Sequence, residues 1–498
     1  MDDGFWYKAW QFALLFGVMV LLGASVYVQS QATTADEVRD ILAEEGVQGG
    51  SGSGGWPVDQ SIRPDLTPVA QVGAADASEN HVSIAPEVPA PINRSDQRAW
   101  DVRIESIEGV CPLDPANGIT TEMWGFRIEG SDEVTCGSPG PILRGRVGDV
   151  VNITLTNRAG NTHPHNIDFH AVTGQGGGAA DLTVAPGETA TIQVRLLYPG
   201  AFMYHCAFGD VPLHIAHGMY GMFIVDPETP LPEVAHEWAI VQSEWYVGDP
   251  GSDGEAPFDA DALFNEEPRF VTFNGRTDAL VGENTLRMAV GERARIYFVN
   301  EGLNLTSNFH PIGSHWDLVY PEGATHQANR VIRGSQTTLV PAGGGTVVEI
   351  DALVPSTIIL VDHALVRTFY KGAIGTIEIT GDNNLEIFAV PGSTPAPGEG
   401  NGESNGPSAQ NGATLFGTTC SACHGPDASG VAGLGPSLIG NVFVAGLSDS
   451  ELITFIMTGR PADHPDNVTG VAMPPSGGNL SLTPEDLADL AAFLRSLG

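Results

Sequence analysis

An internal repeat constrains the fold of this 498-residue chain more than any other feature of its sequence. Three segments of a first copy return in the same order in a second copy: 147–157 as 290–300, 185–206 as 341–363, and 218–221 as 372–375. Both copies consist of short runs of alternating apolar and polar residues, separated by Gly and Pro. The pattern predicts a mainly β chain with two tandem sandwiches, at 98–228 and 229–388.

A short loop in the first copy carries the side chains of an electron-transfer copper site. Between Met203 and Met219 lie a thiol at Cys206 and an imidazole at His214, and Met219 itself adds a thioether. The earlier stretch HPHNIDFH offers a second imidazole at His165. One thiolate, two imidazoles and a weak axial Met are the ligands of a blue, type 1 copper. We therefore predict a cupredoxin-like Greek-key sandwich that binds type 1 copper.

The second copy cannot build the same site. His363 falls where Cys206 stands in the first copy, and Ala373 falls where Met219 stands. The thiolate and the thioether are both lost, although the copy keeps His310 near the place of HNIDFH. We expect a second cupredoxin-like sandwich without blue copper.

Three further imidazoles suit a second metal. His205 is adjacent to Cys206, so its side chain points to the opposite face of the strand, and His170 follows His165 closely. Together with His363 these two residues can form a three-imidazole site with an open position, as a catalytic metal requires. The peptide between His205 and Cys206 would then join the two metals as an electron path.

The C-terminal segment carries the attachment signature of a c-type haem. In the sequence CSACH, Cys420 and Cys423 supply the two thiols and His424 supplies an axial ligand. Met473, just before the last helix, is the expected second axial ligand. A zinc half-site is the alternative, but no second Cys/His pair follows.

We therefore predict a small all-α class I cytochrome c domain at 411–498. Met457 and His464 are less favoured candidates for the second axial position. Residues 389–410 have almost no apolar side chains and are predicted to be a flexible tether.

The N-terminal segment, residues 1–30, is predicted to be a transmembrane or signal helix. The stretch from Phe12 to Val28 is almost wholly apolar, without a basic cluster before it or a clear cleavage site after it, which favours an uncleaved anchor. Either alternative exports the remainder, so we expect a periplasmic or extracytoplasmic protein. Residues 31–97 are acidic and rich in Gly and Pro, which predicts a linker.

Charge and cysteine content narrow the partners and the compartment. The formal net charge is −38, and Lys8 and Lys371 are the only lysines, which argues against nucleic acid and anionic membrane surfaces as partners. In an oxidising compartment Cys111 and Cys136 could pair, although the sequence cannot place their Cα atoms.

Five motifs together match a known family. HNIDFH, YHC, HIAHGM, NFHPIG and LVDH resemble those of the copper-containing nitrite reductases over about 100–385, and the C-terminal domain resembles the variety with a fused cytochrome c. The resemblance implies a type 1 copper on His165, Cys206, His214 and Met219, and a type 2 copper on His170, His205 and His363.

The resemblance also implies an assembly and a catalytic apparatus. In that family the type 2 copper lies between subunits of a homotrimer, so His363 would come from the neighbour. Asp168 and His310 match the two residues that serve proton transfer, and Ile312 matches the apolar side chain over the substrate copper. A carboxylate and an imidazole near a cation are a reasonable proton-delivery pair.

The expected function is dissimilatory nitrite reduction, as in denitrification. Nitrite would be reduced to nitric oxide and water at the type 2 copper, with electrons passing from the fused haem c through the type 1 copper. The upstream donor would be a small cytochrome, a cupredoxin or a membrane quinol-oxidising complex.

Two alternatives belong to different functional classes. A multicopper oxidase also uses cupredoxin repeats, but it needs imidazoles on both sides of the blue-copper Cys, and residue 207 is Ala. A tethered electron carrier without catalysis would explain the haem and the type 1 site. It leaves His170, His205 and His363 without a purpose.

Overall fold

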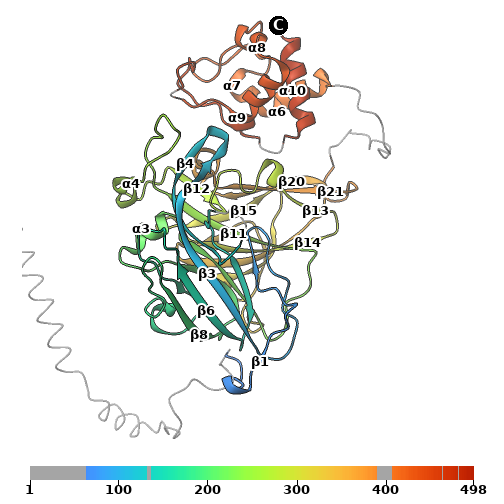
Figure 1. Ribbon diagram of the computed structural model, residues 1–498. Coiled ribbons are helices and arrows are strands. Elements are labelled where there is room, and N and C mark those ends of the chain that lie inside the picture. The colour runs from blue at the N-terminus through green and yellow to red at the C-terminus, as the bar shows by residue number, and fades with distance from the viewer. Residues whose placement is uncertain (1–62, 132–135, 390–406, 463, 480–481) are drawn as a thin grey trace, which may run out of the picture. The chain divides into compact units, whose positions relative to one another are not determined.

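The computed structural model describes residues 63–131, 136–389, 407–462, 464–479 and 482–498 (Figure 1). The apolar segment at 1–30 and most of the expected tether lie outside this part of the chain. Among the helices of the described residues, none is both long and apolar enough to cross a membrane. The described chain is mainly β, with a helical C-terminal domain.

Two five-stranded sheets form the first sandwich. One sheet has the order β1-β3-β6-β8 with β4 paired to β3, and the other has the order β2-β5-β10-β9-β7. The strands are β1 (Gly73–Ala74), β2 (Val82–Ser83), β3 (Arg98–Asp114), β4 (Ile119–Ile128), β5 (Ile142–Arg146), β6 (Val150–Asn157), β7 (Asp168–Phe169), β8 (Thr189–Arg195), β9 (Gly200–His205) and β10 (Tyr220–Asp226). Strand alternation directs Phe223 and Val225 of β10 into the core between the sheets.

A six-stranded and a five-stranded sheet form the second sandwich, with the orders β12-β11-β14-β19-β16-β17 and β13-β21-β20-β15-β18. The strands are β11 (His236–Trp245), β12 (Phe270–Phe273), β13 (Leu286–Ala289), β14 (Arg293–Asn300), β15 (Ser307–Ile312), β16 (Trp316–Tyr320), β17 (Ile332–Ser335), β18 (Thr338–Val340), β19 (Gly344–Asp351), β20 (Ser356–Asp362) and β21 (Ile374–Thr380). The short helices of the two sandwiches are α3 (Val211–Ala216), α4 (Ala260–Phe264) and α5 (Leu365–Lys371). The predicted tandem repeat is therefore present in the fold.

The predicted alignment of the two copies is wrong at one position. In the first copy the Cys206 N–H donates to the Met219 carbonyl, and in the second the Asp362 N–H donates to the Ala373 carbonyl. Asp362, not His363, therefore stands in the place of Cys206. The pairing of β20 with β21 fixes this register. The comparison of the two sequences instead aligned His363, a possible metal ligand, with Cys206, and was therefore wrong by one position.

The segment 63–97 packs on the first sandwich and is not a free linker as expected. Its strand β1 pairs with β3, and its strand β2 pairs with β5. The ring of His81 stacks on Trp100 with the ring centroids 4.2 Å apart. The guanidinium of Arg94 pairs with Asp149 at 2.6 Å. These contacts are made with residues far along the chain, which composition alone does not reveal.

Apolar packing and a buried ionic network join the two sandwiches. Met222 and Ile224 of β10 share one apolar cluster with Val241 of β11 and Val347 of β19. Beside it the buried residue Arg144 of β5 binds Asp226 and Glu237, at 2.8 and 2.6 Å. Glu237 also binds Arg295, which pairs with Glu349 on β19. Each charge of the network has a partner of opposite sign, and the pair of Arg144 with Glu237 crosses the boundary between the two sandwiches.

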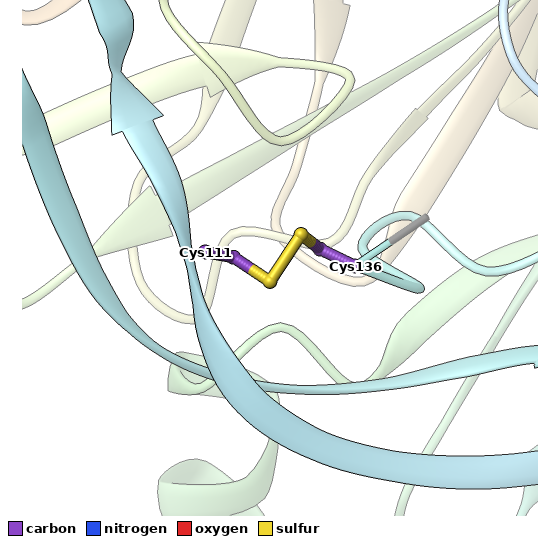
Figure 2. The surroundings of a disulfide bond; sticks show 2 residues. All are labelled: Cys111 and Cys136. Atoms are coloured by element: carbon purple, nitrogen blue, oxygen red, sulfur yellow. A yellow bond between two sulfur atoms is a disulfide. The ribbon is translucent and has the colours of Figure 1, made fainter. Parts of the chain in front are cut away.

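A disulfide links Cys111 on β3 to Cys136 in the loop after β4 (Figure 2). Their Cα atoms are 6.0 Å apart, a normal separation for a disulfide. The pairing that the sequence left open is thus made within the first sandwich.

The C-terminal domain consists of helices α6 (Ala409–Thr419), α7 (Ser421–His424), α8 (Val442–Gly446), α9 (Asp449–Thr458) and α10 (Pro484–Ser496). The last helix begins with a capping box between Thr483 and Asp486, and Pro484 occupies its first turn. Phe416 of α6 packs against Phe493 of α10 with the ring centroids 5.2 Å apart.

We predict that Arg144→Ala lowers the free energy of unfolding of the two-sandwich body by about 3–5 kcal/mol, because it leaves Asp226 and Glu237 buried without their shared partner. Urea unfolding followed by tryptophan fluorescence measures the change. The matched control is Arg103→Ala, whose side chain is 59% exposed and pairs with Glu129 at the surface. The control should cost less than about 1 kcal/mol. Equal effects of the two substitutions would contradict a structural role for the network.

Candidate functional site

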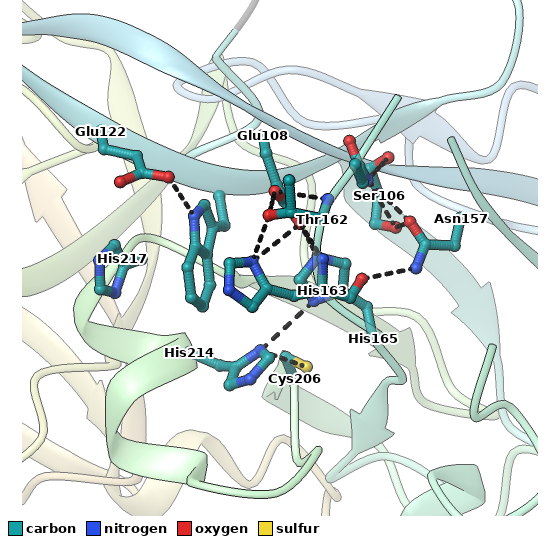
Figure 3. Close-up of polar contacts among 12 residues, drawn as sticks. Ser106, Glu108, Glu122, Asn157, Thr162, His163, His165, Cys206, His214 and His217 are labelled. Atoms are coloured by element: carbon teal, nitrogen blue, oxygen red, sulfur yellow. Dashed lines mark hydrogen bonds and ion pairs between the residues drawn. The ribbon is translucent and has the colours of Figure 1, made fainter. Parts of the chain in front are cut away.

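Three of the four expected type 1 ligands meet in the core of the first sandwich (Figure 3). Nδ1 of His214 lies 3.3 Å from Nδ1 of His165 and 3.3 Å from Sγ of Cys206. All three side chains are buried. Two imidazole nitrogens and one sulfur that converge in this way are a donor set that fits copper.

The loop that carries His214 also positions the fourth expected ligand, Met219. Its N–H donates to the His214 carbonyl at 3.3 Å, and its carbonyl accepts from the Cys206 N–H at 3.0 Å. Next to the thiol, the side-chain oxygen of Asn166 accepts from the Ala207 N–H at 2.8 Å. These hydrogen bonds hold the loop through backbone atoms and the Asn166 side chain, and they leave the donor side chains free to bind a metal.

Burial sets the protonation of the three donors. Desolvation lowers the pKa of His214 to about 4 and also lowers the pKa of His165, so both imidazoles are neutral and able to bind a metal near pH 7. Desolvation raises the pKa of the Cys206 thiol to about 11. A metal that binds here therefore displaces a proton from the thiol.

A second cluster lies on the opposite side of β9, as the alternation of the strand predicts. Nε2 of His205 is 3.1 Å from Nε2 of His170. Asp168, which pairs with His205 across β7 and β9, completes a group that could hold a metal. Desolvation lowers the pKa of His205, which keeps its imidazole neutral.

The remaining residues expected at the type 2 site gather on the second sandwich. The exposed residue His363 follows β20, and its ring centroid lies 5.0 Å from that of His310. Nδ1 of His310 donates to the Gln336 carbonyl at 2.5 Å, which fixes its tautomer. Ile312 packs against the apolar cluster of Ile359, Val361 and Ile374. Among the described residues, the group around His170 and His205 does not include His363.

The carboxylate of Asp168 lies so close to Gly177 that it leaves no room for a side chain at that position. A Cβ on Gly177 would lie 1.9 Å from Oδ1 of Asp168, and Gly177 has a φ of +57°. Gly177 lies in the 3-10 turn Gln175–Gly178, directly after the strand that carries Asp168. Only glycine fits this close approach and this backbone conformation.

The expected haem ligands line one cavity of about 540 Å³ in the C-terminal domain. Cys420 and Cys423 are free thiols at its wall, and Met473 lies among its lining residues. Nδ1 of His424 donates to the Pro436 carbonyl at 2.9 Å, which leaves Nε2 for an iron. Two thiols, an imidazole and a thioether around an otherwise mostly apolar space fit a haem c.

The two weaker axial candidates do not line this cavity. Met457 is half-exposed, and His464 is exposed near Asp466. The assignment of Met473 as the second axial ligand stays a prediction that this placement favours.

Sequence reasoning missed two residues beside the type 1 cluster. Glu108 of β3 accepts a hydrogen bond from Nε2 of His165 at 2.9 Å. Trp124 of β4 lies between the rings of His163 and His217, with centroid distances of 4.3 and 4.1 Å. No local motif marks Glu108 or Trp124, because their position depends on the pairing of β3 with β4.

Comparison with known proteins identifies relatives over most of this chain. A family model for cytochrome c matches residues 409–498, and a model for multicopper oxidases matches residues 113–229. A copper-containing nitrite reductase of Neisseria meningitidis serogroup A is 41% identical over 314 residues, which are 63% of this chain and 77% of that protein. That of Neisseria gonorrhoeae is 41% identical over 63% of this chain and 76% of its own length.

A solved structure agrees with the sequence comparison. The copper nitrite reductase from Nitrosomonas europaea is 32% identical, with a TM-score of 0.50, over 58% of this chain and 96% of that chain.

We predict that Gly177→Ala lowers turnover with nitrite by about 10²–10⁴-fold, the usual worth of a positioned proton donor, because the new Cβ displaces the Asp168 carboxylate. Copper content and the blue absorbance should stay unchanged. Gly176→Ala is the matched control, since its φ is +52° but its Cβ would meet only the Ala179 side chain, at 3.7 Å. The idea fails if both variants lose the same fraction of activity.

Proposed function

The chain belongs to the family of copper-containing nitrite reductases, and we propose on this premise that it is a dissimilatory enzyme that forms nitric oxide. One nitrite, one electron and two protons give one nitric oxide and one water. When bound, the type 2 copper holds nitrite, and the type 1 copper and haem c supply the electron. The observation that carries the proposal is the adjacent pair His205 and Cys206, which belong to two donor clusters on opposite faces of β9.

We assign proton delivery to Asp168 and His310. Asp168 lies within the cluster of His170 and His205, so it can hand a proton to an oxygen atom of a substrate held there. The His310 ring is oriented by its bond to the Gln336 carbonyl and lies beside His363. Ile312 would give the substrate an apolar wall that restricts its orientation.

We propose that the reductase site forms between subunits of a homotrimer. His170 and His363 are both exposed in the single chain, although a catalytic metal needs them together. An assembly that brings the first sandwich of one chain against the second sandwich of the next would join the two halves. His170 and His205 would then share their metal with His363 of the neighbour.

The fused haem domain is proposed as a built-in electron donor to the type 1 copper. A flexible tether of the length predicted for 389–410 would reach roughly 25 Å, which would set an effective concentration of about millimolar. A weak docking contact therefore suffices. Upstream, a small cytochrome, a cupredoxin or a quinol-oxidising membrane complex would reduce the haem.

The proposed location is the periplasm, with the N-terminal segment as a membrane anchor. The disulfide between Cys111 and Cys136 supports an oxidising compartment, since such bonds are rare in the cytosol.

Neither alternative function is favoured by the site. A multicopper oxidase requires a further imidazole after the blue-copper thiol, where this chain has Ala207. A pure electron carrier gives no role to the converging imidazoles of His170 and His205.

We predict that His363→Ala and His205→Ala each abolish nitric oxide release from nitrite and type 2 copper binding. When the two variants are co-expressed in equal amounts and assemble at random, one site in each mixed trimer, about a quarter of all sites, should regain both histidines, because each site takes them from different chains. Nitric oxide release and the type 2 copper signal measure the recovery. A site formed within one chain would give no recovery, and that result would overturn the shared-site proposal.

A second prediction concerns the route of the electron. After rapid reduction of the haem, nitrite should reoxidise it quickly in the wild-type protein and at least about 100-fold more slowly in Cys206→Ser, which removes the type 1 thiolate. Haem absorbance follows the reaction, with a nitrite-free sample as control. Equal rates in the two proteins would show that electrons bypass the type 1 copper.

A further inference from the structure

Glu108 is the one carboxylate that contacts a type 1 donor among the described residues. Its Oε1 accepts from Nε2 of His165 at 2.9 Å and from the His163 N–H at 3.0 Å. Its Oε2 accepts from the N–H and the hydroxyl of Thr162, at 2.9 and 2.7 Å. Figure 3 shows Glu108 between Thr162, His163 and His165, on the side of His165 away from Cys206. The side chain is 8% exposed, so these donors are its main partners.

This geometry fixes which nitrogen of His165 faces the metal. A carboxylate can only accept, so His165 must carry its proton on Nε2. Nδ1 is then unprotonated, and it is Nδ1 that lies 3.3 Å from Nδ1 of His214, on the side of the Cys206 thiol. The hydrogen bond therefore selects the tautomer that a metal ligand needs.

The carboxylate is held as an anion. It accepts hydrogen bonds from the backbone N–H groups of Thr162 and His163, from the Thr162 hydroxyl and from the His165 ring, and only the ionised carboxylate can accept at both oxygens without donating. A permanent negative charge next to a ligand stabilises the more positive oxidation state of the metal.

We propose that Glu108 is a positioning residue of the type 1 copper, which orients His165 through Nε2 and lowers the reduction potential of that copper. The inference rests on the proposed ligand set of His165, Cys206, His214 and Met219. The proposal adds a residue of β3 that lies 57 positions from the ligand that it orients. Its effect on the reaction is to set how readily the electron leaves the type 1 site.

A purely structural role makes a different prediction. Glu108 also closes the turn at Thr162 and His163, so its loss could loosen that turn without any direct effect on copper. Stability would then fall while the reduction potential stayed the same. The potential is therefore the deciding measurement.

The test compares three variants of the full, copper- and haem-loaded protein. Glu108→Gln keeps the shape and an acceptor but removes the charge, so the type 1 potential should rise while copper stays bound. Glu108→Ala removes the acceptor as well, and copper affinity at the type 1 site should fall by about 10–100-fold. Glu122→Gln is the matched control. This exposed carboxylate accepts a hydrogen bond from Trp124 Nε1 at 3.1 Å but contacts none of the type 1 ligands. It should leave potential and affinity unchanged.

Potentiometric titration of the cysteine-to-copper absorbance gives the potential. The proposal fails if Glu108→Gln has the wild-type potential, or if Glu122→Gln shifts it equally. In the reduced, diamagnetic wild-type protein, nitrogen NMR of labelled histidine should show His165 protonated at Nε2, and an Nδ1 proton would overturn the proposal even if a variant failed to fold. A wild-type protein without the blue absorbance would instead refute the ligand set itself.

Discussion

The alternation of side chains along β9 is the constraint on which both metal centres depend. Successive residues of a strand point to opposite faces, so Cys206 enters the core of the first sandwich while His205 faces outward. Pairing with the neighbouring strand fixes this arrangement, since Tyr220 lies opposite His205. A slip of one residue would exchange the thiol and the imidazole between the two sites. One peptide bond thus separates two different donor clusters.

Hydrogen bonds that do not involve the imidazoles or the thiol hold the chain around Cys206. The Met219 backbone bonds to both Cys206 and His214, and Asn166 holds the chain just after the thiol. Because burial keeps the imidazoles of His165 and His214 neutral, these two side chains neither repel each other as cations nor need to lose a proton when a metal binds. A site held in this way limits the reorganisation that accompanies electron transfer, which suits the electron-transfer role proposed for it.

The sequence revealed the parts of the site that have local signatures. The Cys206 loop, the CSACH motif and the tandem repeat each lie within a short stretch or recur visibly, and the structure brings their side chains together. Glu108 could not be found in this way, because its contact with His165 spans 57 residues and depends on strand pairing. The segment 63–97 was misread for the same reason, since Arg94 reaches Asp149 across 55 residues. Contacts between residues that are far apart in the sequence produce no local motif or periodic pattern, so they cannot be predicted from the sequence alone.

The corrected register shows which residues occupy equivalent positions in the two copies. Asp168 pairs with His205 on β9, and His310 pairs with Val361, the counterpart of His205 on β20. The two residues assigned to proton delivery thus occupy equivalent positions in the two sandwiches. In the proposed trimer, equivalent edges of the two copies would meet at each site, one with a carboxylate and the other with an imidazole. Duplication would then have supplied both halves of one proton-delivery pair from a single ancestral position.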